Sequence, residues 1–465
     1  MRTTGSEAAA AARIGARLGG RMRGELLGLL RPCFARVEPW LQAGKYVAAA
    51  MSDLPKRNGW TLAERAGDRT PDQMQRLLNR AVWDAFAVMG VVRRFAVAGL
   101  DEAARKTGRR RGLAVGALDE TGQVKQGTRT AGVKRQYLGC VGKVANGINT
   151  VHLSYVREAT GHALIGAREW VPAEHIDDPA RSQVMGLPAD LVFRTKGQLA
   201  IDILAEAFAE GVRLDFVCGD EVYGSCTELR QFLEAHGQAY VLRVASSFPL
   251  VLPGGVTLTC KQAAAVRLGS GRGWEVRSAG KGSKGERWYA WAWLGTASPR
   301  HHLLIRRHLA TGELAFHYCY LPQGQQASLN LLARAAGLRW PAEENFEFSK
   351  GCFGLDQSQV RRYTALARHT VLVMAALAIC AVTAALLRRR TDTQAPAPAR
   401  PDQAPPLDPG MIPLTVPETM RLLARPPPPG SIGHWLNWRR GHQARSRWYH
   451  QRTRLGRHIQ ITQVS

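Results

Sequence analysis

Residues 113–119 read Leu-Ala-Val-Gly-Ala-Leu-Asp, a short apolar run that ends in the carboxylate of Asp119. A second apolar run occupies residues 214–218 and is followed closely by Asp220. Apolar runs of this length predict buried β-strands. Between them, the amphipathic pattern at residues 197–210 predicts a helix. This alternation of strand and helix predicts an α/β fold built on a mixed sheet.

Further strands are predicted on both sides of these two. Residues 136–144 and 149–156 carry strand patterns, and the Asn146-Gly147 pair between them is typical of a hairpin turn. Residues 239–244 predict another strand after a short helix. Residues 245–328 break the alternation with Gly-rich turns and aromatic strands, so we expect a β-rich insertion there.

The two ends of the chain differ from this middle part. Residues 24–105 carry apolar residues at helical spacing, and their short basic helices suit a DNA-binding bundle or a solvated surface. Residues 1–23 are rich in Ala and Arg and lack the apolar core of a secretory signal, so we expect them to be disordered. Residues 391–465 form a Pro-rich linker and a basic tail with interleaved aromatic residues.

The charge balance points to a polyanionic partner. Lys and Arg total 63 against 37 acidic residues, which gives a net charge of +26. Nucleic acid and an anionic membrane surface are the two partners that such a surplus favours. The eight cysteines include no Cys-x-x-Cys pair, so a zinc ribbon or a redox motif is not expected.

One segment is long enough to raise the membrane alternative. Residues 370–387 are eighteen residues without a charge, the lower limit for a transmembrane helix. The segment is rich in Ala and contains two Thr, and motif-bearing sequence lies on both sides of it. These features favour a buried core helix, and a membrane anchor remains the alternative.

Asp119 and Asp220 are the first candidates for chemistry. A carboxylate at the carboxyl end of a buried strand opens into the crevice where α/β sheets bind ligands. Two such carboxylates on neighbouring strands repel each other unless a cation lies between them. Hard oxygen ligands select Mg²⁺ or Mn²⁺. The alternative is a pair of loop-capping aspartates, and the local pattern alone does not choose between the two.

A third carboxylate lies in the segment that begins Arg339-Trp340-Pro341. Pro341 suits the first turn of a helix. Glu343 follows Arg339 by four residues and precedes Lys350 by seven, so a helix places all three on one face. That face presents a carboxylate between two cations, which suits a metal ligand beside phosphate-binding groups. The alternative is a salt-bridged surface face.

With these motifs in place, the chain resembles insertion-sequence transposases of the DDE superfamily. Asp119, in an Asp-x-Thr pattern, and Asp220 match the first two acidic residues of that family. The chain is similar to the branch with a Tyr-x2-Arg-x3-Glu-x6-Lys signature, because Arg339, Glu343 and Lys350 stand at three of its four positions. Further similar stretches are Gly132-Val133 with Gln136-Tyr137, Gly354-Leu355-Asp356, and Trp438-Arg439-Arg440 with His442-Gln443.

The resemblance implies a function. Such enzymes have a ribonuclease H-like catalytic domain in which three carboxylates, here Asp119, Asp220 and Glu343, hold two Mg²⁺ ions, and Mn²⁺ can replace Mg²⁺. Arg339 and Lys350 are implied to contact DNA phosphates. The expected activity is metal-dependent strand cleavage and strand transfer by cut-and-paste transposition. The partners are double-stranded DNA, both transposon ends and target, and a second copy of the chain in the synaptic complex.

Other details of the resemblance leave alternatives open. Ala336 stands at the Tyr position of the signature and His302 where related enzymes carry a stacking Trp, so hairpin formation during cleavage is an open expectation. Glu120 is a rival to Asp119, although strand alternation turns only one of them toward the metal ions. Trp288, Trp291 and Trp293 are interpreted as core residues, with stacking on a flipped base as the alternative.

The predicted organisation follows from the patterns and the resemblance together. The expected parts are a disordered N-terminus at 1–23, a helical DNA-binding domain at 24–105, a ribonuclease H-like catalytic domain at 106–244 and 329–390, a β-rich insertion at 245–328, and the linker and tail at 391–465. We expect a cytoplasmic, nucleoid-associated protein without a membrane segment. The alternatives are an inactive transposase-derived DNA-binding protein and a stand-alone nuclease.

Overall fold

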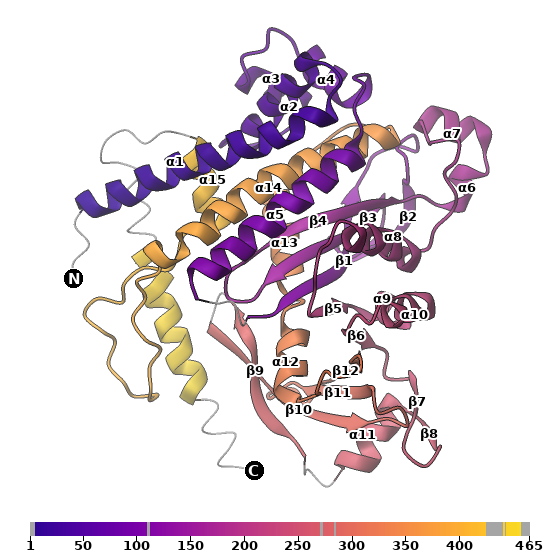
Figure 1. Ribbon diagram of the computed structural model, residues 1–465, viewed down its shortest axis with the longest axis vertical. Coiled ribbons are helices and arrows are strands. Elements are labelled where there is room, and N and C mark those ends of the chain that lie inside the picture. The colour runs from indigo at the N-terminus through magenta and orange to yellow at the C-terminus, as the bar shows by residue number, and fades with distance from the viewer. Residues whose placement is uncertain are drawn as a thin grey trace.

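The computed structural model describes the chain except for residues 1–4, 109–111, 270–272, 283–284, 425–439, 442 and 457–465. Figure 1 shows long helices packed along one side of a large twisted sheet, and shorter helices on its other side. Part of the expected Pro-rich linker, Pro426–Pro429, and most of the Trp438-containing motif lie outside the described residues.

Five strands form the centre of the sheet. β1 (Ala114–Val124) pairs antiparallel with β3 (Lys143–Arg157), which pairs antiparallel with β4 (Gly161–Trp170). On its other side β1 pairs parallel with β5 (Phe216–Gly219), which pairs parallel with β6 (Tyr240–Val244). Numbered along the chain, these five strands lie in the order 3-2-1-4-5, with the second antiparallel to the others. This is a ribonuclease H-like mixed sheet, which confirms the predicted fold class.

The residues of the expected insertion extend the same sheet. After β6, the sheet continues through four antiparallel strands, namely β12 (Leu314–Tyr320), β11 (His301–Arg307), β10 (Gly285–Gly295) and β9 (Glu275–Gly282). The small hairpin of β7 (Pro249–Val251) and β8 (Thr257–Thr259) and the helix α11 (Cys260–Leu268) lie beside them. The region is rich in strands, and its last strand is hydrogen-bonded directly to β6 of the five-stranded centre.

The expected turn at Asn146-Gly147 is wrong. β3 begins at Lys143 and runs through both residues, and the turn lies at residues 139–142, after β2 (Lys134–Leu138). Gly147 has another role, because a Cβ there would lie 2.3 Å from the backbone oxygen of Gln123 on β1. The glycine permits close approach of two paired strands rather than a turn.

The helical elements fall into three groups. The N-terminal group consists of α1 (Gly5–Leu30), η1 (Arg31–Cys33), α2 (Val37–Ala50), α3 (Gly59–Arg65), α4 (Asp72–Asn79) and α5 (Ala85–Lys106). The middle group consists of α6 (Ala173–Ile176), α7 (Pro179–Met185), α8 (Lys196–Ala209), α9 (Glu221–Ser225) and α10 (Thr227–Ala235). The last group consists of α12 (Leu329–Gly337), α13 (Pro341–Gly351), α14 (Tyr363–Thr391) and α15 (Val416–Ala424).

The expectation of a disordered segment at 1–23 is corrected, because α1 begins at Gly5. The Ala-rich composition favours a helix, and the helix is held by packing. Leu18 contacts the small cluster of Leu387, Leu414 and Leu422, and Leu26 is fully buried. A tertiary contact that is distant in sequence therefore orders a segment whose local pattern lacks an apolar core.

α14 is the central helix of the molecule, and it contains the uncharged stretch at 370–387. It lies against α5, β4 and α1 (Figure 1), and 94% of its most apolar 18-residue window is buried inside the protein. Its length and composition alone would allow a membrane span. Burial on nearly all sides instead explains why it carries no charge there, so it is the core helix that its Ala-rich sequence predicted.

The contact between α5 and α14 depends on one glycine, which leads to a prediction. A Cβ at Gly99 would lie 2.5 and 2.7 Å from the two methyl groups of Val382, a stiff side chain in a buried position. We expect Gly99→Ala to lower the free energy of unfolding by about 1–3 kcal/mol through overpacking. Gly28→Ala is the control, because the added methyl group meets open space, and it should stabilise by up to about 1 kcal/mol. Urea denaturation measures the free energy of unfolding of both variants. Equal changes in the two would contradict the overpacking at Gly99.

Candidate active site

The candidate site lies where β1 and β5 part. Their parallel pairing ends at Ala117 and Cys218, whereas β1 continues to pair with β3 as far as Val124. Asp119 and Asp220 each follow this last pair by two residues, so both stand at the opening of the crevice. The sequence pattern predicted Asp119 at the end of a strand. The structure places it within β1 instead.

Asp119 is held by Arg339. One guanidinium nitrogen donates to Oδ2 of Asp119 at 2.7 Å, and the other donates to Oε1 of Glu343 at 2.9 Å. The side chain of Asp119 is 13% exposed and that of Glu343 is 44% exposed. A single cation thus bridges two of the three predicted carboxylates, and Arg339 does so from the turn just before α13.

Asp220 is placed by the start of α9. Its Oδ1 accepts a hydrogen bond from the backbone N–H of Val222 at 2.9 Å, so Asp220 caps this short helix. α9 is pressed against β6, because a Cβ at Gly224 would lie 1.8 Å from the backbone oxygen of Arg243. The close approach fixes the turn that carries Asp220. The loop-capping alternative therefore describes a real contact, which is compatible with a second role of the other carboxylate oxygen.

The electrostatics of Asp119 show that the three carboxylates are close enough to influence one another. Burial raises the pKa of Asp119 to about 6, and the negative charges of Asp220 and Glu343 add to that rise. Arg339 and the backbone N–H of Glu120 act in the opposite direction. A buried carboxyl beside two others is the arrangement that a divalent cation would relieve.

Glu120 faces the other side of the sheet. Its carboxylate pairs with the ammonium group of Lys196 at the start of α8. Asp119 points instead toward Arg339 and the α12–α13 side, as strand alternation requires. Of the two rivals, the structure therefore brings Asp119, not Glu120, together with Arg339 and Glu343.

Lys350 lies at the other end of α13. Its ammonium group donates to the backbone oxygen of Gly122 on β1 at 3.0 Å. Arg339 and Lys350 thus attach both ends of α13 to the strand that carries Asp119, and Glu343 lies between them. The three signature residues do face one way, although Arg339 precedes the helix and does not belong to it.

The candidate donors are carboxylate oxygens. No three His, Cys, Asp or Glu side chains in the described part of the chain are arranged as one metal-binding group. Asp119 and Glu343 already share one cation, the Arg339 guanidinium, and all the candidate donors are hard oxygens that suit Mg²⁺ or Mn²⁺. The residues therefore fit such ions in donor chemistry, and Asp119 and Glu343 are brought together by Arg339.

Two side chains beside the carboxylates were given no role from the sequence. Lys196 pairs with Glu120, and Tyr223 is fully buried. The hydroxyl of Tyr223 has no hydrogen-bond partner among the described residues, and its pKa is raised by burial and by Glu120, Asp119 and Asp220. Tyr223 lies in the stretch that follows Asp220, but only the fold shows that its ring turns into the core beneath the site.

The aromatic residues of the extended sheet divide into core and surface. Trp291 is 1% exposed, as the core interpretation expects, whereas Trp288 and Trp293 are 39% and 37% exposed. The ring of Trp293 lies 5.0 Å from that of His302 between centroids. Ala336 lies on α12 and packs at the edge of the cluster that includes Ala117 and Cys218.

Fold and site together define a class: a ribonuclease H-like protein with acidic residues gathered at the crevice between its parallel strands. The sequence profile of the family described as DDE superfamily endonuclease matches residues 30–288, more than half of the chain. The chain belongs to this family. The match confirms the resemblance to DDE-type transposases. Asp119 and Asp220 lie within the matched residues, and Glu343 lies beyond them.

Two individual proteins are also similar. The probable transposase for insertion sequence element IS701 of Microchaete diplosiphon is 32% identical over 107 residues. That stretch covers 23% of this chain and about a quarter (25%) of the length of that transposase. A structure of the piggyBac transposase synaptic complex with hairpin DNA aligns at 12% identity and a TM-score of 0.36, over 77% of this chain and 67% of that one.

Proposed function

We propose that the chain is a DNA transposase that cleaves the ends of an insertion sequence and joins them to target DNA. The observation that carries the proposal is the meeting of Asp119, Arg339 and Glu343 at the point where β1 and β5 part, within electrostatic reach of Asp220, in a member of the DDE superfamily. The crevice of an α/β sheet is where ligands bind, and these are the residue types that phosphoryl transfer requires.

The residues have distinct proposed roles. Asp119, Asp220 and Glu343 would hold two Mg²⁺ ions, for which Mn²⁺ can substitute. When bound, such ions activate water or a DNA 3′-hydroxyl and stabilise the leaving oxygen in an in-line displacement. Arg339 orients Asp119 and Glu343, and its guanidinium is of the kind that binds a phosphate in a bidentate manner. Lys350 supplies a point charge close to β1.

The proposal extends to partners. Double-stranded DNA is the substrate, both as transposon ends and as target, and the net charge of +26 supports a polyanionic partner. The N-terminal helices would recognise the terminal inverted repeats, and two copies of the chain would pair two ends in one complex. A soluble, cytoplasmic and nucleoid-associated protein is consistent with the burial of α14.

A nicking assay tests the proposal. Wild-type protein is expected to nick a duplex that carries the inverted repeats flanking its reading frame, in the presence of Mg²⁺ or Mn²⁺ and not with EDTA. Asp220→Ala is expected to bind that duplex but not to cut it. If wild type also fails to cut with either metal, the alternative of a catalytically inactive DNA-binding protein is correct. Equal cutting of duplexes without the repeats would instead indicate a stand-alone nuclease.

A further inference from the structure

An open groove, whose lining includes none of the three candidate carboxylates, lies between the N-terminal helices and the segment that precedes α14. It consists of two adjoining cavities of about 490 and 450 Å³. Both are lined by Gln75 and Asn79 of α4 and by Arg362, so the two are continuous. One wall thus belongs to the N-terminal helical group and the other to the ribonuclease H-like part of the chain.

Arginines dominate the groove. Arg76 comes from α4 and Arg80 directly follows that helix. Arg361 and Arg362 come from the segment before α14, and Arg129 comes from the loop between β1 and β2. All five side chains are exposed, and within the described residues none of them forms an ion pair. Asp72 is the one carboxylate among the lining residues, and it accepts a hydrogen bond from Thr70.

Hydrogen bonds hold the backbone near Arg361 in place, and the guanidinium groups of these arginines take no part in them. The carbonyl oxygen of Arg361 accepts from the N–H of Ala131 at 2.8 Å, which joins the two loops of the catalytic part. The ammonium group of Lys125 donates to the carbonyl oxygen of Ser358 at 2.9 Å. Across the groove, the N–H of Arg57 donates to Oε1 of Gln357 at 2.6 Å, which fixes the N-terminal group to the same segment.

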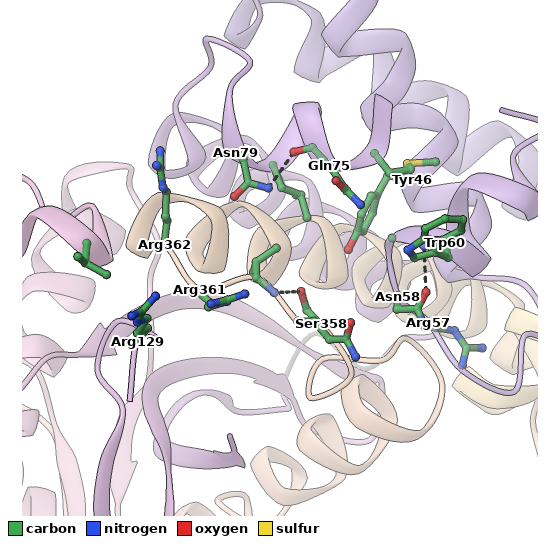
Figure 2. Close-up of a pocket in the computed structure, with 16 residues that line it drawn as sticks. Tyr46, Arg57, Asn58, Trp60, Gln75, Asn79, Arg129, Ser358, Arg361 and Arg362 are labelled. Atoms are coloured by element: carbon green, nitrogen blue, oxygen red, sulfur yellow. Dashed lines mark hydrogen bonds between the residues drawn. The ribbon is translucent and has the colours of Figure 1, made fainter. Parts of the chain in front are cut away.

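Size and lining identify the kind of anion that fits. Figure 2 shows Arg129, Arg361 and Arg362 toward one end of the first cavity, and Asn58 and Trp60 at the other. A single phosphate would occupy a small part of a cavity of about 490 Å³. The distribution of arginines along the two cavities therefore suits a row of phosphates. Single-stranded nucleic acid is bound by successive stacked aromatic rings. Here Trp60 is 68% exposed, whereas the ring of Tyr46 is buried and its hydroxyl bonds to His369, so the groove offers one exposed ring and not a series.

We propose that this groove binds the sugar–phosphate backbone of duplex DNA, with Arg129, Arg361 and Arg362 on one wall and Arg76 and Arg80 on the other. The inference rests on the proposed transposase function and deepens it. Because the walls come from two parts of the chain, one DNA segment in the groove contacts the end-recognising helices and the catalytic part together. Contacts to phosphates set the register of a duplex without reading its sequence.

The test is the salt dependence of DNA binding. The probe is a fluorescein-labelled 40-base-pair duplex of arbitrary sequence, and anisotropy is measured with full-length protein in EDTA over a series of NaCl concentrations. Loss of two phosphate contacts in Arg361→Gln/Arg362→Gln is expected to lower the slope of log K against log salt by about 2 and to weaken binding roughly tenfold at low salt. Lys261→Gln/Arg267→Gln on α11 removes the same charge from exposed residues at the far end of the molecule and serves as the matched control.

Each outcome decides the matter. A slope change in the groove variant that the control does not share supports the groove, and Arg129→Gln, from a different loop, should then lower the slope by about 1. Equal slopes for groove and control variants, or tighter binding of a 40-nucleotide single strand than of the duplex, overturn it. Thermal unfolding midpoints verify that the variants are folded, and Arg361→Lys/Arg362→Lys should keep the wild-type slope. Because EDTA prevents cleavage, the result is independent of whether the chain nicks DNA with Mg²⁺.

Discussion

Asp119→Asn is expected to abolish metal-dependent nicking, with a loss of about 10³-fold or more, whereas Glu120→Gln should retain activity within about tenfold of wild type. Loss of a metal-binding carboxylate removes several kcal/mol of transition-state stabilisation, and each 1.4 kcal/mol corresponds to about tenfold in rate. Asp119 faces Arg339 and Glu343, whereas Glu120 faces Lys196 on the opposite side of β1. The measurement is the single-turnover rate of nicking with Mg²⁺ on a duplex with the element's ends.

The pair of variants is a matched comparison, because both replace a partly buried acid of β1 by its amide. Each loses one salt bridge, so similar shifts in thermal unfolding midpoint are expected for the two. DNA binding without metal should be unchanged in both. If Glu120→Gln abolishes nicking and Asp119→Asn does not, the assignment of the first carboxylate is reversed. If neither variant affects the rate, the proposed site is not the catalytic one.

The candidate site was predictable from the sequence because its residues lie in local patterns. Asp119 and Asp220 follow apolar strand runs, and the spacing of Arg339, Glu343 and Lys350 fits one helical face. The structure adds what spacing cannot show. Asp119 lies in the middle of a long strand, and it stands at a crevice only because β5 stops pairing beside it. That opening depends on the lengths of β1 and β5, which are distant in sequence both from each other and from the helix that supplies Glu343.

The fold was predictable where the sequence has the periodicity of a strand or a helix. It was less predictable where contacts with distant residues determine the local conformation. A glycine after Asn is typical of a hairpin turn, but Gly147 lies inside β3, because the partner strand β1 approaches too closely for a side chain. α1 is ordered by contacts with residues near position 390 and beyond, which no local window contains. The burial of α14 is likewise a property of what surrounds it.

A single buried charge, Arg93, helps to attach the N-terminal helices to the central sheet. Its side chain on α5 is fully buried. It donates to the carbonyl oxygen of Ile165 on β4 at 2.9 Å and pairs with Glu206 at 3.2 Å and with Glu210 at 3.1 Å, both at the C-terminal end of α8. One residue thus connects the helical group, a central strand and a helix that covers the sheet.

Arg93→Met is therefore expected to lower the free energy of unfolding by about 2–3 kcal/mol, because it leaves the carbonyl oxygen of Ile165 without its buried donor. Glu206 and Glu210, whose side chains are 42% and 25% exposed, keep Arg168 and Arg94 as partners. Arg94→Met is the matched control: this neighbour also pairs with Glu210, but its side chain is 55% exposed, and such surface pairs contribute about 1 kcal/mol or less. Urea denaturation, followed by tryptophan fluorescence and circular dichroism, measures both variants. A loss for Arg93→Met no larger than that for Arg94→Met would show that the buried cation contributes no more to the attachment of α5 than the exposed one does.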